Sequence, residues 1–276
     1  MNEVTFIIPT IGRDTLKYSI QSILNQTNEN WKLIVIFDGI EPTITPVNQK
    51  ISIIKSSKKG VSKNSAGNVR NFGMEFVKTR WIAFLDDDDV IANNYVETLN
   101  DELNNFPCTD VIIFRMYRSK QGDVLPQLNT DNFYESSVGI SFALKTEIFK
   151  KGIQFTPSHV EDFNYLDLLR KKNYCIMISP YILYFVDSDG SQVINKCMTD
   201  NVTGNRVVLN SPPKGAGASR SPLTAERPAA LQLKEAACLG TPRPWTYVFF
   251  IFLIFIFILY LKVSRGSSVR RAFTSR

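Results

Sequence analysis

The first 210 residues alternate between two patterns of apolar positions. Short runs rich in Val, Ile and Phe predict buried strands at residues 4–9, 31–39, 51–57, 80–89 and 109–119. Segments with an apolar residue every three or four positions predict helices at residues 14–27, 66–79, 93–106 and 161–173. Strands that alternate with helices favour an α/β fold, in which a mostly parallel, mixed sheet carries helices on both faces.

The composition of the chain changes abruptly near residue 210. Every Asn and every Asp lies at or before Asn210, and the segment that follows is rich in Pro, Ala, Gly, Ser and Arg. Such a segment buries little apolar surface. We therefore expect a folded domain at residues 1–205 and a disordered linker at residues 206–244.

A continuous apolar run, WTYVFFIFLIFIFILYL, occupies residues 245–261. Its length in helical form is about 26 Å, the short end of what crosses a bilayer, and Trp and Tyr lie near its ends as in an aromatic belt. We expect this segment to be a hydrophobic helix that anchors the protein to a membrane, followed by a basic tail at residues 262–276. The alternatives are a hydrophobic hairpin packed on the domain and a tail that is foreign to it.

The net charge of +6 does not indicate a nucleic-acid partner. Residues 1–210 carry 22 Lys and Arg against 24 Asp and Glu, whereas residues 211–276 carry 10 against 2. The basic excess belongs to the tail, and no basic stripe interleaved with aromatic residues is present. Basic residues after the apolar run favour a cytosolic C-terminus. A cytosolic domain on the same side would then require a segment that re-enters the membrane or lies in its interface.

The cysteines indicate the compartment of the main domain. Cys108, Cys175, Cys197 and Cys238 are far apart and lack the spacing of a zinc site, so we expect buried thiols in a reducing compartment. The apolar run near the N-terminus is too short for a signal peptide. We therefore expect the main domain to be cytosolic.

Four carboxylates, Asp86 to Asp89, follow the apolar run WIAFL without a break. Like charges this close repel one another and raise each other's pKa, a penalty that a bound cation would remove. The alternative is a solvated loop that leads into a helix N-cap. Ligands of parallel sheets bind beyond the carboxyl ends of the strands. Asp38 ends another predicted strand at the same edge, which favours a ligand site there.

Five segments now follow one another in a characteristic order: FIIPTIGRD, IVIFDG, AGNVRNFGM, WIAFLDDDD and VEDFNYLDLLRK. In this order they resemble the family 2 glycosyltransferases of the GT-A fold, over residues 3 to about 195. The resemblance implies transfer of a sugar from a nucleotide-diphosphate sugar, with UDP the expected nucleotide. The acceptor would be a hydroxyl of a glycan, lipid or protein. It also implies a divalent cation, Mn²⁺ or Mg²⁺, on the diphosphate and inversion at the anomeric carbon.

The resemblance implies roles for the residues that bind the donor. Asp88 is expected to hold the metal, and Asp86 to reach the ribose or a metal-bound water. Because four acids are contiguous, the register can slip by one, and Asp89 is then a further candidate metal ligand. The remaining donor-site residues are expected to be Asp38 against the uracil ring, Pro9 and Thr10 beside it, and Arg70 near the pyrophosphate or the base.

The acceptor hydroxyl must lose its proton as it attacks, which requires a positioned general base. The resemblance places Asp162 in that role, with Glu161 directly before it as a second catalytic candidate. On residue type alone, an Asp at the start of a helix is equally explained as a cap.

Two other enzyme classes lack support, because oxidoreductases with a dinucleotide site and nucleotidyltransferases usually carry a Gly-rich turn after the first strand. The remaining alternative is a catalytically degenerate, membrane-tethered protein that binds nucleotide sugars. Three features leave it open: the unusual run of four Asp, the small acceptor-side region, and a late segment, residues 184–192, without the histidine often found there. Asp187 or Asp189 would have to replace that histidine.

Overall fold

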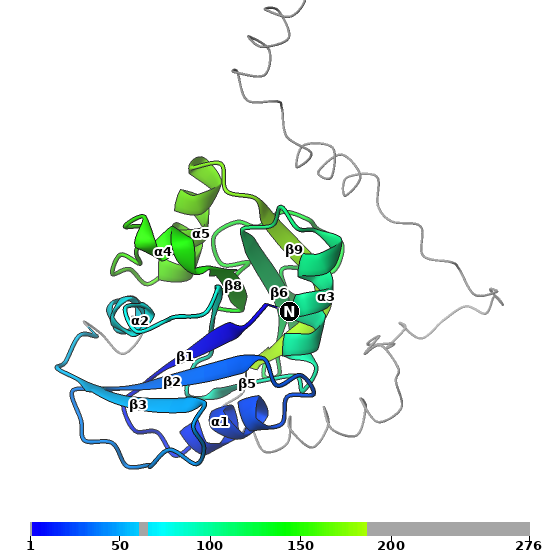
Figure 1. The fold of residues 1–276 in the computed structure, drawn as a ribbon. Coiled ribbons are helices and arrows are strands. Elements are labelled where there is room, and N and C mark those ends of the chain that lie inside the picture. The colour runs from blue at the N-terminus through cyan, green and yellow to red at the C-terminus, as the bar shows by residue number, and fades with distance from the viewer. Residues whose placement is uncertain (1, 61–65, 187–276) are drawn as a thin grey trace, which may run out of the picture. The chain divides into compact units, whose positions relative to one another are not determined.

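The computed structural model describes residues 2–60 and 66–186. In that part of the chain, nine strands form one mixed sheet in the order β3-β2-β1-β4-β8-β6-β9-β5, with β7 paired to β6 (Figure 1). The strands are β1 Val4–Thr10, β2 Trp31–Asp38, β3 Ile51–Ser56, β4 Trp81–Phe84, β5 Asp89–Ile91, β6 Val111–Arg118, β7 Asp123–Leu125, β8 Phe142–Lys145 and β9 Ile176–Val186. The helices are α1 Leu16–Leu24, α2 Gly67–Met74, α3 Tyr95–Asn105, α4 Thr146–Lys150 and α5 Glu161–Lys171.

The first half of the sheet is parallel, as predicted. β1 pairs with β2 on one side and with β4 on the other, and β3 extends the sheet beyond β2. The register joins Thr10 to Phe37 and Ile7 to Phe84. The carboxyl ends of β1, β2 and β4 therefore meet at one edge of the sheet, which is where the predicted site residues were expected.

The second half of the sheet departs from the predicted, mostly parallel arrangement. β8 lies between β4 and β6 and is antiparallel to both. β5 is antiparallel to β9, and β7 to β6, so only the pair of β6 with β9 is parallel here. β5, β7 and β8 have three or four residues each, too few to give a periodic signal, and Pro180 interrupts the apolar run of β9.

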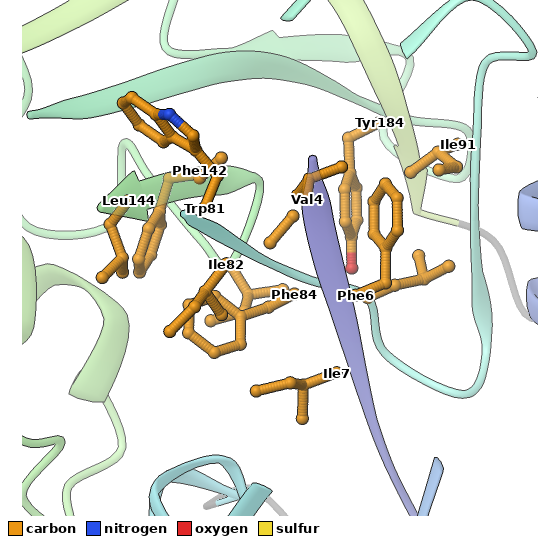
Figure 2. Packing of buried hydrophobic residues seen from close by; sticks show 14 of the residues in the cluster. Val4, Phe6, Ile7, Trp81, Ile82, Phe84, Ile91, Phe142, Leu144 and Tyr184 are labelled. Atoms are coloured by element: carbon orange, nitrogen blue, oxygen red, sulfur yellow. The ribbon is translucent and has the colours of Figure 1, made fainter. Parts of the chain in front are cut away.

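Helices cover both faces of β1. Phe6 packs edge-on against Tyr95 of α3, with ring centroids 5.4 Å apart. The next residue, Ile7, lies against Gly73 of α2. Successive side chains of a strand point to opposite faces, and Figure 2 shows Phe6 and Ile7 on opposite sides of β1. A helix on each face confirms the predicted α/β architecture.

Residues 2–60 and 66–186 do not test several of the predictions made for other parts of the chain. No helix within residues 2–60 and 66–186 is both long and apolar enough to span a bilayer. The predicted linker, the apolar run 245–261 and the basic tail lie outside the described residues. Cys108 and Cys175 are half-buried rather than buried, with their Sγ atoms 3.9 Å apart, and the other two cysteines lie outside as well.

The packing of α2 on the sheet can be tested at Gly73. A methyl group there would lie 2.8 Å from Cγ2 of Ile7 and 3.3 Å from Cγ1 of Ile36. Both neighbours are fully buried, so they cannot retreat freely. Gly73→Ala is therefore expected to lower the free energy of unfolding by about 1–3 kcal/mol, although alanine favours helices more than glycine does. Urea denaturation measures the difference.

Gln21→Ala, on the exposed face of α1, is the matched control, and its expected change is within about 0.5 kcal/mol. A Gly73→Ala protein as stable as the parent would contradict the close approach of α2 to β1 and β2.

Candidate active site

Asp38 ends β2 and is buried at the carboxyl edge of the sheet, with 3% of its surface exposed. Its carboxylate accepts hydrogen bonds from the backbone N–H groups of Lys59 (2.6 Å) and Gly60 (3.0 Å), and the Lys58 ammonium lies 3.1 Å away. Burial by itself raises the pKa of Asp38, but these donors outweigh it and hold the pKa below its usual value. Asp38 is therefore a fixed negative charge that anchors the loop after β3.

The four acids of the run divide into two pairs. A turn, closed by a hydrogen bond of 3.2 Å from the Asp89 N–H to the Asp86 carbonyl, separates β4 from β5. The side chains of Asp86 and Asp88 are 33% and 38% exposed, whereas Asp87 and Asp89 are buried. The two carboxylates that a ligand can reach are thus those of Asp86 and Asp88.

Asp87 ties the run to the loop after β1. It accepts hydrogen bonds from Oγ1 of Thr10 (2.6 Å) and from Nη1 of Arg13 (2.7 Å). The same Thr10 oxygen accepts the N–H of Gly12 at 2.9 Å. Pro9 is buried in β1 beside Ile36 of β2. Pro9 and Thr10 therefore lie at the expected edge, and the Thr10 hydroxyl is engaged in holding the acidic run.

Asp89 is held by Tyr184 of β9, a residue that sequence analysis did not identify. The Tyr184 hydroxyl donates to Oδ2 of Asp89 at 2.8 Å and accepts the Asp86 N–H at 3.1 Å. Burial makes the largest contribution to raising the pKa of Tyr184, and the carboxylates of Asp89 and Asp86 raise it further, to well above its usual value. The Tyr184 hydroxyl therefore keeps its proton. Asp89 is buried against Tyr184 and is not placed with the exposed pair; its role as a metal ligand stays a prediction. The apolar residues of β9 gave no signal for this contact.

Arg70 of α2 lies buried among three carboxylates. Its Nη2 donates to Asp86 at 2.5 Å, its Nη1 donates to Glu161 at 2.7 Å, and Oδ1 of Asp162 lies 3.5 Å from Nη1. Burial lowers the pKa of Arg70, but the three carboxylates outweigh it and raise the pKa above its usual value. Arg70 is thus neither a surface arginine nor directed at an open diphosphate site, because its terminal nitrogens are engaged by side chains of the protein.

Glu161, the first residue of α5, closes the amino end of α2. Its two oxygens accept the N–H groups of Ala66 (2.9 Å) and Gly67 (3.0 Å), where the helix dipole favours negative charge. A side chain at Gly67 would begin 2.7 Å from Oε2 of Glu161, so glycine permits this close approach. Glu161 is 5% exposed and also binds Arg70. These contacts position α2 and Arg70, and the expected catalytic role of Glu161 stays a prediction.

Asp162 has a different environment from its neighbour. Its side chain is 25% exposed, and its Oδ1 is buried without a hydrogen-bond partner among the described residues. Burial raises the pKa of Asp162 to about 7, because the opposing effect of Arg70 is offset by the charges of Asp86 and Glu161. A carboxylate that titrates near neutral pH can accept a proton in one step and release it in the next. Asp162 therefore fits a general base.

Arg13 is a further site residue that sequence analysis did not identify. Its Nη1 donates to Asp87 at 2.7 Å and to Asp88 at 2.9 Å. Burial and the nearby charge of Asp86 raise the pKa of Asp88, and Arg13 acts against them. The position of Arg13 in the sequence could have identified it as a site residue. It lies in the loop after the first strand, at the edge where such sheets bind ligands.

The exposed pair suits a hard divalent cation. Carboxylate oxygens are ligands that Mg²⁺ and Mn²⁺ prefer. Among residues 2–60 and 66–186, no group of three or more His, Cys, Asp or Glu is arranged to bind a metal. Mg²⁺ commonly takes one or two protein carboxylates and completes its shell with substrate phosphates and water. Asp86 and Asp88 fit that pattern, and the late candidates Asp187 and Asp189 lie outside the described residues.

A loop at residues 126–139 borders the open side of Asp162. A Cβ built on Gly139 would lie 4.0 Å from Oδ2 of Asp162, and Phe133 packs edge-on against Phe163, with ring centroids 6.3 Å apart. Arg115 of β6 is buried and donates to three carbonyl oxygens of this loop. The hydrogen bonds from Arg115 therefore hold this loop in place beside Asp162, the candidate base.

Comparisons with known proteins give the family and the fold of this chain. The model of the family described as glycosyl transferase family 2 matches residues 5–164, more than half of the chain. The chain is 29% identical over 236 residues to the poly(ribitol-phosphate) beta-N-acetylglucosaminyltransferase TarP of Staphylococcus aureus, covering 75% of this chain and 69% of TarP. It is 33% identical to an uncharacterised glycosyltransferase of Rickettsia bellii, over 48% of this chain and 19% of that protein.

Among solved structures, S. aureus TarS residues 1–349 in complex with UDP-GlcNAc is similar to this chain. The TM-score is 0.50 at 16% identity, and the match covers 66% of this chain and 58% of the TarS chain. This likeness supports the GT-A-like fold. The chain thus spans well under two thirds of the Rickettsia protein and somewhat under two thirds of the TarS chain.

The raised pKa of Asp162 predicts a pH-dependent stability difference. In the folded protein Asp162 keeps its proton up to about pH 7, whereas in the unfolded chain it loses it near pH 4. The ionisation of Asp162 therefore lowers the free energy of unfolding of the protein as the pH rises through that window. Asp162→Asn is expected to be more stable than the parent by an amount that grows with pH, and its gain at pH 8.5 should exceed its gain at pH 5 by at least about 1 kcal/mol. Thermal unfolding in EDTA at both pH values measures this.

Asp167→Asn on the same helix is the control. Ion pairs with Lys171 and Arg170 lower the pKa of the half-buried Asp167 carboxyl, so this variant should show no gain at either pH. An Asp162→Asn difference that is equal at pH 5 and pH 8.5 would contradict the raised pKa.

Proposed function

Because this chain belongs to glycosyl transferase family 2, we propose that it transfers a sugar from a UDP-sugar to an acceptor hydroxyl, with inversion at the anomeric carbon. One arrangement carries the proposal. The buried Arg70 joins the exposed Asp86, on the donor side, to Asp162, whose pKa is about 7. A donor site and a base matched to neutral pH are thus held together by one side chain.

The donor proposed first is UDP-GlcNAc. TarP, the relative matched over most of this chain, is named as an N-acetylglucosaminyltransferase, and the similar TarS structure holds UDP-GlcNAc. Asp38 supports a base site at the end of β2, because a buried carboxylate with a lowered pKa remains a hydrogen-bond acceptor for a ring N–H. A uracil would share this carboxylate with the Lys59 and Gly60 amides.

The proposed cofactor is Mn²⁺ or Mg²⁺, held by Asp88 with Asp86 beside it. When bound, such a cation supplies positive charge that stabilises the departing diphosphate. The protein's own contribution is to keep both carboxylates exposed at one place. Arg70 fixes Asp86 by a direct hydrogen bond, and the buried Asp87 and Asp89 fix the turn that carries the pair.

In the proposed reaction, the acceptor oxygen forms a bond to the anomeric carbon while Asp162 takes the hydroxyl proton. The bond between that carbon and the diphosphate oxygen breaks, and its electron pair leaves with UDP. A single displacement of this kind inverts the anomeric centre. Asp162 afterwards returns its proton to water, which a pKa near 7 permits at neutral pH.

The proposed acceptor site lies between Asp162 and the loop at residues 126–139. Leu128 and Tyr134 of this loop are 60% and 59% exposed, and a rigid loop with an exposed aromatic ring suits a sugar or a lipid-linked sugar. A glycan, a lipid or a protein hydroxyl remains the proposed acceptor class. TarP acts on poly(ribitol phosphate) by its name, which makes that polymer the first acceptor to try. Association with a membrane through residues 245–261 and a cytosolic main domain stay proposals.

The proposal predicts that two carboxylates fail in different ways. Asp88→Asn is expected to lower turnover at least about 100-fold and to abolish the gain in UDP affinity that Mn²⁺ provides. Asp162→Asn is expected to lower turnover at least about 100-fold and to leave UDP affinity within about twofold, because Asp162 does not belong to the donor side. UDP release from UDP-GlcNAc, with an acceptor panel, and calorimetric titration of UDP measure the two effects.

Asp167→Asn, a substitution of a half-buried carboxylate on the same helix α5, serves as the control with parental turnover. An Asp162→Asn protein that transfers sugar near the parental rate would exclude Asp162 as the base. A parent that binds UDP with Mn²⁺, yet releases no UDP from any nucleotide sugar, would favour the degenerate nucleotide-sugar-binding protein instead.

A further inference from the structure

Arg13 contacts two carboxylates of the acidic turn, residues 86–89, and these contacts have no role in the proposed reaction. A single nitrogen, Nη1, contacts Oδ1 of Asp87 at 2.7 Å and Oδ2 of Asp88 at 2.9 Å. The Asp87 carboxylate is buried, whereas the side chains of Arg13 and Asp88 are 40% and 38% exposed. One end of this bridge is thus fixed inside the protein, and the other end is open to solvent and to ligands.

The open end of the bridge is Asp88, the carboxylate that is proposed to bind the cation. A carboxylate oxygen that accepts a charged hydrogen bond is a weaker metal ligand, since the bond must be broken or shared. The positive guanidinium also repels a divalent cation at this distance. Arg13 and the cation therefore compete for Asp88.

The fixed end keeps Arg13 in the site when Asp88 is taken. Asp87 is anchored by the Thr10 hydroxyl at 2.6 Å, so it can hold the guanidinium without the help of Asp88. A side chain released from Asp88 then remains close to the turn, where an incoming diphosphate can accept hydrogen bonds from it. A guanidinium suits phosphate oxygens for the same reasons that it suits carboxylates.

We propose that Arg13 is a resident counter-ion of the acidic turn that competes with the divalent cation for Asp88 until the cation arrives together with a diphosphate. The inference rests on the proposed metal site. Arg13 is accordingly a positioning residue that couples two binding events: it weakens binding of the cation alone, and it opposes binding of the cation–diphosphate complex much less. The enzyme would then hold its metal mainly when donor is present.

Removal of the competing charge tests the coupling. In Arg13→Gln, Mn²⁺ alone is expected to bind about fivefold tighter than in the parent, the effect of one partly exposed ion pair. In the presence of UDP, the two proteins are expected to bind Mn²⁺ within about twofold of each other. Electron paramagnetic resonance of free Mn²⁺ measures all four dissociation constants on the full chain, without any assay of turnover.

Lys17→Gln is the matched control, because it removes the same charge from the exposed face of α1 and should leave both constants within about twofold of the parent. Should Arg13→Gln fail to fold, Arg13→Lys takes its place. It keeps the charge but loses the planar fork, and its affinity for Mn²⁺ alone is expected to exceed that of the parent by a smaller factor.

The outcomes separate this inference from the proposed function. A parent that binds Mn²⁺, with a folded Arg13→Gln that binds Mn²⁺ alone equally or more weakly, would overturn the counter-ion role and leave the metal site intact. It would mean that Arg13 only fastens the loop after β1 to the turn. A parent that binds no Mn²⁺ with or without UDP would overturn the metal site, and the counter-ion role with it.

Discussion

The site depends on the ion pairs that the buried guanidinium of Arg70 forms with three carboxylates. It contacts Asp86 from the turn after β4, and Glu161 and Asp162 from α5, while its own helix is α2. Without a cation between them, these carboxylates would repel one another, and an unpaired buried charge typically costs about 3–5 kcal/mol. Arg70 itself is placed by Glu161, which closes the amino end of α2 where Gly67 lets the carboxylate approach. The proposed donor side and the proposed acceptor side are thus joined through one charge.

Acids that are adjacent in the sequence have different tasks because their surroundings differ. Glu161 has a hydrogen-bond donor on each oxygen and is a structural carboxylate. Asp162, one residue later, has a buried oxygen that finds no donor in the described part of the chain, and a pKa raised to about 7. The acidic turn is divided in the same way, with Asp86 and Asp88 exposed and the two other carboxylates tied inward. Residue type supplies the carboxylates, and local packing decides which of them are free for chemistry.

Much of the architecture could be predicted from the sequence, because long apolar runs and helical spacing report burial directly. The end of β2 near Asp38 followed from such a run, and so did β4, although the predicted strand at residues 80–89 continued through the acidic turn. The contacts of Tyr184 and Arg13 could not be predicted, since both depend on how distant segments meet. A run of four identical residues likewise carries no information on which side chains point outward. β8, inserted between β4 and β6, was missed because four residues give no period.

In the proposed site, Asp86 and Asp88 face a divalent cation that joins the protein to the diphosphate of the donor. A crystal structure of the protein with Mn²⁺ and UDP, with anomalous data recorded for manganese, tests it most directly. We expect an anomalous peak bonded to the Asp88 carboxylate and to the diphosphate, with Asp87 and Asp89 still turned toward Arg13 and Tyr184. A map without a peak at this turn, or with manganese on Asp87 or Asp89, would contradict the claim.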